Sequence, residues 1–246
     1  MRRVLILGAT SAIAAEVAAV YDRYGDRIHL VARNAEKLDD LARRIDVTRV
    51  TTTLADFAKL DRCDGVVASA IEALGGLDTA LIAHGDLGDQ VATERSFASA
   101  EAVFRTNLVS VVSLLIPLAN HMEKARSGRL GVITSVAGDR GRPRNYTYGA
   151  AKGALNVYLQ GLRTRLRAAG VSVTTIKLGP VDTPMTRDHK KNIFFAKPAP
   201  VARDIVRALE RGQGEVYIPS IWRAIMPLVR NTPEELFRRL SFLSGR

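Results

Sequence analysis

The sequence is poor in cysteine and in aromatic residues. Its single cysteine, Cys63, rules out an intrachain disulfide, which fits a reducing compartment such as the cytoplasm. Aromatic residues make up 6% of the chain and are not interleaved with the arginines. A protein that binds single-stranded nucleic acid would favour such interleaving. The cysteine and histidine spacing of a zinc finger is also missing. We therefore expect a cytoplasmic protein with no metal centre and no nucleic-acid partner.

Long apolar runs are missing as well. The apolar stretch after Met1 is only as long as one strand and has no signal-peptide cleavage site behind it. No stretch approaches the roughly 18 to 20 apolar residues that span a bilayer, so we expect no membrane span. Positive charge is in excess, with 36 Lys and Arg against 25 Asp and Glu and a net charge of +11. This excess is compatible with an anionic ligand, an anionic membrane surface or solubility alone.

Strand-like and helix-like segments alternate along almost the whole chain. The predicted strands are nearly continuous apolar runs, as in parallel strands buried on both faces, at 4–7, 28–31, 50–53, 79–83, 130–134, 171–178 and 216–219. The predicted helices are 12–24, 35–45, 59–74, 96–125, 148–169 and 201–211. This alternation predicts an α/β fold, a doubly wound seven-stranded parallel sheet in three layers. We expect residues 1–246 to form one domain that binds its ligands at the carboxyl ends of the strands.

The turn after the first strand has few glycines. The stretch "LGATSAIA" places Gly8 where the strand gives way to a helix, but Ala12 and Ala14 stand where a phosphate-binding loop normally has glycine. Free N–H groups at such a helix N-terminus favour a pyrophosphate. Ala32 and Arg33 follow the second predicted strand, where NAD-preferring sites have a carboxylate. A guanidinium pairs with a 2′-phosphate, so we expect NADP(H) in preference to NAD(H).

Residues suited to acid–base chemistry follow the fifth predicted strand. The stretch "TSVAGDRGRPRNYTYGAAKGAL" contains Ser135 at the strand's end, then Tyr148 and, four residues later, Lys152. The last two share one face of a helix, one turn apart. A ketone that accepts a hydride also needs a proton at its oxygen. Tyr148 is suited to supply that proton, with Lys152 lowering the phenol's pKa from about 10 and Ser135 binding the substrate oxygen.

These motifs resemble those of the single-domain short-chain dehydrogenases/reductases over residues 1–220. The matching catalytic set is Asn107, Ser135, Tyr148 and Lys152. The resemblance implies a Rossmann fold, reduction of a carbonyl with a nicotinamide cofactor, a water relay anchored by the asparagine, and a homodimer or homotetramer. The cofactor-binding positions that it implies are Gly8, Thr10, Ser11, Ala12, Ile13, Arg33, Asn34, Asp56, Phe57, Ala83, His84, Gly85, Tyr148, Lys152, Gly179, Val181 and Thr183. This sequence departs from the family pattern at two positions, His84 and Pro180. Pro180 follows Gly179, whereas the family pattern has the proline before the glycine.

Three alternating arginines, Arg140, Arg142 and Arg144, lie between the serine and the tyrosine. Guanidinium groups bind phosphate or carboxylate in a planar, bidentate way, so these arginines are candidates for holding an anionic group of the substrate. A solvated basic loop or a subunit contact is the plainer interpretation. Further along the chain, we expect residues 186–211 to form a substrate lobe.

Residues 220–246 form a predicted C-terminal amphipathic extension, in which apolar residues are flanked by arginines. Such a segment can cover the substrate pocket, pack on another subunit or lie on an anionic membrane. With "ALIAHGDLGD" and the arginine-rich loop, it resembles the reductases of decaprenylphosphoryl 2-keto-pentose, which implies a lipid-linked substrate and peripheral contact with the inner face of the membrane. The alternatives are reduction of another small-molecule carbonyl (acyl, steroid-like or polyol) and a non-catalytic nucleotide-binding protein.

Overall fold

The computed structural model describes residues 1–187 and 191–240. A seven-stranded parallel sheet lies at its centre, in the order β3-β2-β1-β4-β5-β6-β7. Its strands are β1 (Arg3–Leu7), β2 (Arg27–Ala32), β3 (Val50–Leu54), β4 (Thr79–Ile82), β5 (Arg129–Ser135), β6 (Ser172–Leu178) and β7 (Glu215–Ile218). The strand order reverses at β1, which pairs with β2 on one side and with β4 on the other. The predicted doubly wound α/β fold is confirmed.

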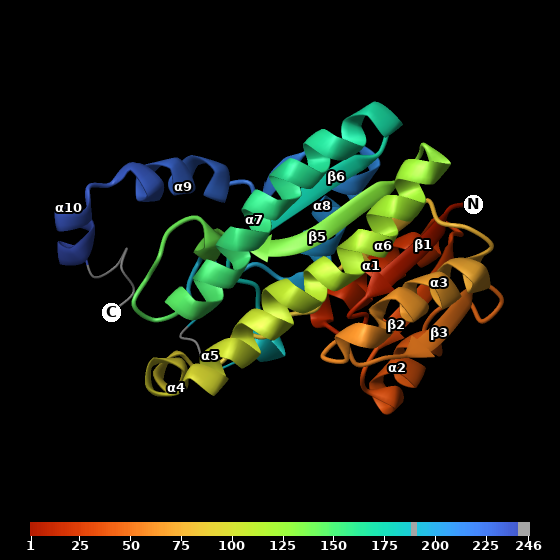
Figure 1. Ribbon diagram of the computed structural model, residues 1–246, viewed down its shortest axis with the longest axis horizontal. Coiled ribbons are helices and arrows are strands. Elements are labelled where there is room, and N and C mark those ends of the chain that lie inside the picture. Colours follow the sequence, from red (N-terminus) through yellow and green to blue (C-terminus); the bar gives the residue numbers. More distant parts are fainter. Residues whose placement is uncertain (188–190, 241–246) are drawn as a thin grey trace.

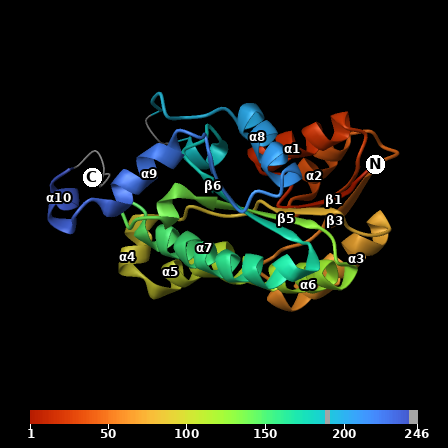
Figure 2. The same ribbon diagram turned by 90° about the horizontal axis from the view of Figure 1, so that it is seen from above.

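Helices cover both faces of the sheet and give the three predicted layers (Figure 2). One face carries α1 (Ala12–Arg23), α2 (Ala35–Ala42) and α8 (Pro198–Glu210). The other face carries α3 (Cys63–Leu74), α6 (Ser110–Ala125) and α7 (Tyr146–Leu166). Contacts between α1 and α8, and between α3 and α6, close each layer.

The strand β1 explains why the strand sequences are continuous apolar runs. Leu5 and Leu7 belong to the apolar cluster on the α3 and α6 side, whereas Val4 and Ile6 belong to the cluster on the α1 and α8 side. Successive side chains point to opposite faces, so a strand covered on both faces needs an apolar residue at every position. The edge strand β3 departs from this expectation, because its residues are exposed or only half-buried.

The helix predicted at 96–125 is continuous but contains an irregular turn. It consists of α5 (Phe97–Phe104), a π-helical turn (Arg105–Val109) and α6. Such π turns are rare and occur frequently at functional sites. By length and composition the whole helix, Phe97–Ala125, could cross a membrane, contrary to the sequence-based expectation. Its inner face nevertheless packs against α3 in the core, as expected for a core helix of a sheet protein.

A short helix that was not predicted, α4 (Gln90–Arg95), fastens the start of α7. Asp89 caps α4 by accepting the N–H of Val91 at 2.8 Å. The Gln90 side-chain oxygen accepts the N–H of Thr147 at 3.2 Å, and the hydroxyls of Thr93 and Thr147 lie 2.9 Å apart. The N-terminal end of α7 is thereby held from the side of α4.

The last two helices, α9 (Trp222–Asn231) and α10 (Glu234–Arg239), extend from the body of the molecule near the end of β5 (Figure 1). Met226, Val229 and Phe237 form a third apolar cluster with Val136, which follows β5. One face of the predicted amphipathic extension is therefore buried within this chain, and its last residues, 241–246, lie outside the described residues.

The predicted substrate lobe at 186–211 needs a correction. Residues 198–210 form α8, whose apolar face is buried against α1 in one layer of the fold. The spacing of Val201, Ile205 and Leu209 places them on one face of α8, where all are buried. Only residues 186–197 are left for a lobe, and 188–190 of these lie outside the described residues.

Candidate active site

The predicted site residues come from loops that follow neighbouring strands of the sheet. Gly8 follows β1, Arg33 follows β2, His84 comes after β4, Ser135 ends β5, and Gly179 follows β6. The carboxyl ends of parallel strands lie at one edge of a sheet, so these loops meet there (Figure 1).

Gly8 and His84 are packed backbone to backbone. Gly8 has a φ of +82°, in the left-handed region that favours glycine. A Cβ at this position would lie 2.6 Å from the backbone nitrogen of His84, which is too close for any other residue. The His84 ring in turn lies against Phe57, with 4.7 Å between the ring centroids. The single glycine of the turn thus allows the loops that follow β1 and β4 to pack closely against each other.

The His84 ring is held by one of its two nitrogens. Nε2 lies 2.8 Å from the Ser110 hydroxyl, which itself donates to the carbonyl of Thr106 at 2.8 Å, so Nε2 is the donor. Nδ1 is then an acceptor, and it is buried with no hydrogen-bond partner among residues 1–187 and 191–240. Burial, together with the nearby charges of Lys152 and Arg33, lowers the pKa of His84 to about 3. His84 is therefore neutral and offers one buried acceptor.

The N-terminus of α1 offers backbone donors at the same edge. Ser11 caps the helix by accepting the N–H of Ala14 at 3.2 Å. The amides of Ala12 and Ile13 precede the first helical hydrogen bond, which runs from Ala15 to Ser11. Such leading amides bind anions well. The methyl group of Ala14 is fully buried in the core, which accounts for the absence of a glycine there.

The residues expected around the adenosine part of a cofactor lie at the surface. Arg33 is exposed and forms no ion pair within the described part of the chain. Asn34 caps α2, because its side-chain oxygen accepts the N–H of Lys37 at 2.8 Å. Asp56 is also exposed, and its carboxylate accepts the N–H of Ala58 at 3.1 Å. Of these three predicted residues, Arg33 is the one whose charged group has no local partner.

Tyr148 and Lys152 lie one turn apart on α7, as predicted. The Lys152 Nζ lies 5.8 Å from the centroid of the Tyr148 ring and donates to the carbonyl of Ile133 at 3.2 Å. The pKa of Tyr148 is raised to about 12, mainly by burial and further by the charge of Asp86, against the lowering effect of the nearby Ser135 hydroxyl. Burial also lowers the pKa of Lys152 to about 8. The expected lowering of the tyrosine pKa is therefore wrong, because desolvation of the phenol outweighs the effect of nearby charge.

Close backbone contacts fix Ser135 relative to this pair. The Ser135 hydroxyl accepts the N–H of Ala137 at 3.1 Å, which holds the short turn after β5. That turn lies directly on α7, since a Cβ on Gly149 would be 2.7 Å from the Ala137 carbonyl oxygen. A Cβ on Gly138 would likewise be 2.7 Å from the nitrogen of Gly153. On α7, Gly149 directly follows Tyr148 and Gly153 directly follows Lys152. The turn after β5 therefore packs beside the Tyr–Lys pair and is positioned with it.

Asn107 is fully buried in the π turn and holds the loop after β4. Its amide nitrogen donates to the carbonyls of Asp86 at 2.7 Å and Val103 at 2.9 Å, and its oxygen accepts the N–H of Asp86 at 3.1 Å. Gly85 lies between Asn107 and Lys152, because its Cβ would be 2.9 Å from the Asn107 oxygen and 3.4 Å from the Lys152 Nζ. The structure thus brings all four predicted catalytic residues together.

Comparison with known proteins agrees with this arrangement. A family model described as short chain dehydrogenase matches residues 2–193. The chain belongs to the short-chain dehydrogenase family. An uncharacterised oxidoreductase of Mycobacterium tuberculosis (strain ATCC 25618 / H37Rv) is 36% identical over 240 residues, 96% of each chain. An uncharacterised oxidoreductase of Streptomyces coelicolor is 32% identical over 241 residues, 97% of this chain and 96% of the other.

Solved structures show the same fold. A short-chain dehydrogenase from Streptomyces avermitilis has a TM-score of 0.81 and 19% identity, and covers 99% of this chain and 98% of its own. A variant of the actinorhodin polyketide ketoreductase with NADPH has a TM-score of 0.80 and 22% identity, over 88% of this chain and 95% of its own. The Rossmann-type architecture is therefore that of the family.

Members of this family use a nicotinamide dinucleotide, and the residues of this dehydrogenase fit one. The leading amides of α1 are suited to the pyrophosphate, and the buried Nδ1 of His84 lacks the donor that a bound hydroxyl would supply. Arg33, at the end of β2, is the cation that a 2′-phosphate would need. A nicotinamide would be held near Gly179, beyond β6, by the family resemblance.

In this dehydrogenase, Arg140 fastens the C-terminal helices. It donates to the carbonyls of Arg230 and Thr232, both at 3.0 Å, and pairs with Glu234 at 2.8 Å. Its guanidinium also lies over the Phe237 ring, 4.4 Å from the centroid. Its donors are used within the chain, which corrects the prediction that Arg140 binds substrate.

Arg142 and Arg144 differ from Arg140. Arg142 is half-buried, and one of its N–H groups contacts the Met226 sulfur at 3.8 Å. Its Nε is buried and has no hydrogen-bond partner in the described chain. Arg144 is exposed. Arg142 is therefore the predicted arginine whose side chain is partly buried against a weak acceptor, the Met226 sulfur.

The segment after β6 lies beneath α9, a contact that sequence reasoning missed. A Cβ on Gly179 would lie 2.0 Å from the indole nitrogen of Trp222, so only glycine fits there. Val181 is buried and pairs with Ala196 in a parallel bridge, and Thr183 caps the short turn that follows. The C-terminal apolar spacing predicted an amphipathic helix, but it carried no signal for this glycine–tryptophan contact.

A buried ionic network near Ser135 was also missed. Lys177, the penultimate residue of β6, is 3% exposed and pairs with Asp139 at 2.8 Å and with Glu215 at 3.1 Å. The Tyr217 hydroxyl donates to the other Asp139 oxygen at 2.6 Å. A lysine within the apolar strand sequence "TTIKLG" was the available signal, because a buried lysine needs a partner.

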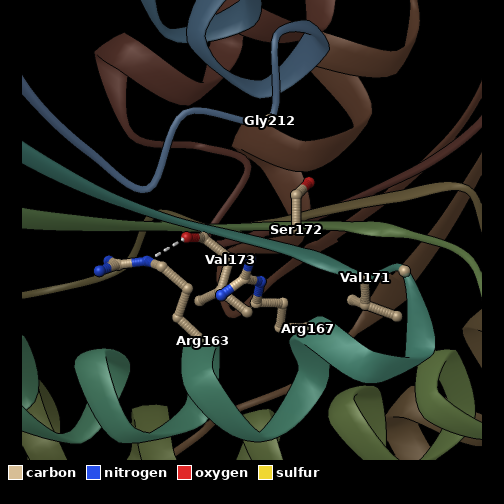
Figure 3. A pocket seen from close by; sticks show the side chains of 7 residues that line it. Arg163, Arg167, Val171, Ser172, Val173 and Gly212 are labelled. Carbon is tan, nitrogen blue, oxygen red and sulfur yellow. Dashed lines mark hydrogen bonds between the residues drawn. The ribbon is translucent and has the colours of Figure 1, made fainter.

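Two shallow hollows are lined by none of the predicted site residues. One, of about 240 Å³, is at the amino end of β6, where Arg163 donates to the carbonyl of Val173 at 2.9 Å (Figure 3). The other, of about 460 Å³, is lined by residues of α8, β7 and the start of α9, including Arg207. Ligands of doubly wound sheets bind at the carboxyl ends of the strands, so the hollow at the amino end is not a candidate active site.

Proposed function

We propose that this dehydrogenase reduces a ketone to a secondary alcohol with NADPH and that Tyr148 gives the proton. The observation that carries this proposal is that the Ser135 hydroxyl is near enough to the Tyr148 phenol to influence its pKa, with the buried Lys152 one turn away. A carbonyl oxygen that enters between the two hydroxyls can accept a hydrogen bond from each. A protein that only binds a nucleotide has no use for this arrangement.

Each residue has a distinct part in the proposed reaction. The nicotinamide, when bound, supplies the hydride that reduces the carbonyl carbon. Ser135 orients the carbonyl oxygen, and Tyr148 transfers its phenolic proton to that oxygen as negative charge develops there. Lys152 stabilises the phenolate that remains, and Asn107 keeps the loop at Gly85 in place beside the lysine.

The shifted pKa values suit the direction of reduction. With a pKa of about 12, Tyr148 carries its proton at neutral pH and is ready to donate it. Lys152, with a pKa of about 8, is mostly charged at neutral pH and loses that charge within a moderately basic range. The acid and its supporting cation are therefore both present near neutrality.

The preference for NADPH is supported by charge at the end of β2. Arg33 is exposed there without an ion pair in the described chain, and a 2′-phosphate would supply the missing anion. The neighbouring Ala32 and Asn34 bring no carboxylate that would repel the phosphate.

The substrate is proposed only as a class. A lipid-linked keto-pentose phosphodiester is supported by the basic, partly apolar α9 and α10, where Leu228 is 74% exposed, and acyl, steroid-like or polyol carbonyls are the alternatives. Contact with the inner face of the cytoplasmic membrane belongs to the same proposal. A homodimer or homotetramer is supported by exposed apolar residues on α5 and α7, such as Phe97 and Val157.

A cofactor titration followed by a substrate screen tests the function. We expect NADPH to bind more tightly than NADH, and a panel of ketones that includes phosphorylated 2-keto-pentoses to yield at least one substrate that oxidises NADPH. If neither nucleotide binds up to millimolar concentration, the enzyme proposal is wrong. If Tyr148→Phe keeps full turnover on an identified ketone, the proposed proton donor is wrong.

A further inference from the structure

The side chain of Arg142 is half-buried and has no anionic partner among residues 1–187 and 191–240. It lies in the loop between Ser135 and α7, where Asn145 donates to its backbone carbonyl at 3.1 Å. The polar contact of its side chain is the Met226 sulfur at 3.8 Å, a weak acceptor, and its Nε is buried with none. A buried charge without a partner is costly, and such charges are normally paired or bind a ligand.

The charged groups around Arg142 leave it without a carboxylate. Asp139 is near enough to influence it, but its two oxygens already accept from Lys177 at 2.8 Å and Tyr217 at 2.6 Å. No carboxylate of the described chain lies within ion-pair distance of Arg142. Burial and the nearby positive charge of Arg144 both lower the pKa of Arg142, which means that its cation is held in an unfavourable environment.

A second buried donor without an acceptor lies close by on α9. The indole N–H of Trp222 is buried and has no hydrogen-bond partner among the described residues. Trp222 and Met226 are four residues apart, so they share one face of α9, the face that packs over the turn after β5. Gly179 brings the backbone after β6 against the same indole. Arg142 contacts Met226, and Trp222 lies one helical turn from Met226, so both unpartnered donors belong to side chains at the same part of α9.

We propose that Arg142 and Trp222 form a subsite for an anionic oxygen group, phosphate or carboxylate, carried by the carbonyl substrate. The inference rests on the proposed reductase function and adds the class of substrate to it. The guanidinium would bind the anion in a charge-assisted way, and the indole N–H would donate to one of its oxygens. The cofactor's own phosphates are accounted for elsewhere, at α1 and at Arg33, so the anion at Arg142 is one that the substrate brings.

The protein contains its own probe for this subsite, because Trp222 is its single tryptophan. We would saturate the full-length protein with NADP⁺ and titrate inorganic phosphate, methyl phosphate and acetate while recording the intrinsic fluorescence. Saturating binding that changes the Trp222 emission is expected for at least one of these anions. The same titration of Arg142→Gln should lose that change, whereas chloride at equal ionic strength should not produce it.

Steady-state kinetics with matched ketones distinguish whether the subsite binds a phosphate or a carboxylate of the substrate. One pair is a 2-ketopentose 5-phosphate with the free 2-ketopentose, and the other is benzoylformate with its methyl ester. We expect a preference for the charged member of at least one pair, reduced on the order of 10- to 100-fold by Arg142→Gln and mainly through KM. The measured quantity is the ratio of kcat/KM for the charged and the neutral member of each pair.

Controls keep the outcome interpretable. Arg207→Gln removes an equal charge from an exposed arginine on α8 that is paired with Asp204, so it should keep the preference. Arg142→Lys keeps the charge but not the planar fork and should be intermediate. Trp222→Phe keeps the ring without the N–H and, followed by calorimetry, should weaken binding of the anion. These two variants carry the test if Arg142→Gln lowers Tm strongly.

The outcomes distinguish the subsite from the reductase function. If neutral ketones are reduced but no anion changes the fluorescence and no charged ketone is preferred, the subsite is wrong and the reductase stands. The subsite is also wrong if Arg142→Gln keeps the preference for charged ketones. If Arg142→Gln unfolds, the subsite is wrong when both Arg142→Lys and Trp222→Phe keep that preference. An Arg142-dependent response to phosphate in a protein that reduces no carbonyl supports the subsite and contradicts the reductase.

Discussion

The ammonium nitrogen of Lys152 lies 5.8 Å from the centre of the Tyr148 ring, and burial moves the pKa values of the two groups apart, to about 8 and about 12. The tyrosine therefore keeps its proton over the whole range in which the lysine titrates. The lysine, and not the tyrosine, sets the basic limit of the proposed reduction. This relationship leads directly to the first two predictions.

Tyr148→Phe should remove the proton donor without disturbing the fold. Because general acid catalysis contributes typically 10²- to 10⁴-fold, we expect kcat to fall by about that factor and any loss of NADPH affinity to be much smaller. Tyr158→Phe, at a partly exposed position of the same helix, is the matched control and should leave kcat unchanged. Equal losses in both variants would mean that the hydroxyl of Tyr148 has no special part.

The rate of reduction should fall as pH rises through about 8. Below that pH Lys152 is charged and stabilises the developing phenolate, and above it the neutral amine does not. The measurement is kcat against pH with saturating NADPH. Arginine stays charged at all these pH values, so Lys152→Arg should be slower but free of this basic limb. If kcat of Lys152→Arg falls at basic pH as it does in the wild type, another group causes this fall.

Ala12→Gly should leave NADPH affinity equal or make it tighter. Ala12 carries one of the leading amides of α1, and removal of its methyl group allows a closer approach to the pyrophosphate. Calorimetric titration with NADPH measures the effect. Ala19→Gly, in the middle of the same helix, is the control for the helix destabilisation of about 1 kcal/mol that glycine causes. A clear loss of affinity confined to Ala12→Gly would show that the methyl group takes part in binding.

Arg33→Ala should weaken NADPH more than NADH. The guanidinium is available to pair with the 2′-phosphate, which NADH lacks, and charge-assisted hydrogen bonds are worth about 1.5–3 kcal/mol, or roughly 10- to 100-fold in Kd. The ratio of the two dissociation constants is the measured quantity. Arg44→Ala removes an exposed arginine just beyond α2 and should keep the ratio. An unchanged ratio in Arg33→Ala would refute the preference assigned to this residue.

The sheet and the Tyr–Lys pair were predictable because both follow from local periodicity. Burial on both faces makes β1 apolar throughout, and a spacing of four residues places Tyr148 and Lys152 on one side of a helix. The π turn at Asn107 was not predictable, because its sequence continues the apolar helical pattern of its neighbours. The pKa of Tyr148 depends on burial by segments distant in sequence, which no local pattern encodes.

Long-range partners also decided the roles of the charged residues. Arg140 and Arg142 are two residues apart and chemically identical. Arg140 donates to Thr232 and pairs with Glu234, whereas the Nε of Arg142 is buried with no hydrogen-bond partner among the described residues. That difference arises from the fold of residues 220–240, which the sequence predicted only as amphipathic. The alternation of arginines therefore identified the correct loop but could not separate a structural contact from a candidate ligand.

Lys177→Met should destabilise the protein and reduce kcat through the turn after Ser135. It leaves the Asp139 carboxylate, 4% exposed, without its cation, and breaking a buried pair typically costs about 3–5 kcal/mol. The double variant Lys177→Met/Asp139→Leu removes both charges and should recover much of the stability lost by the single variant. Chemical unfolding measures the free energies, and kcat/KM on a neutral ketone reports the position of Ser135. If the single and double variants are equally destabilised, the pair is not coupled as the 2.8 Å contact requires.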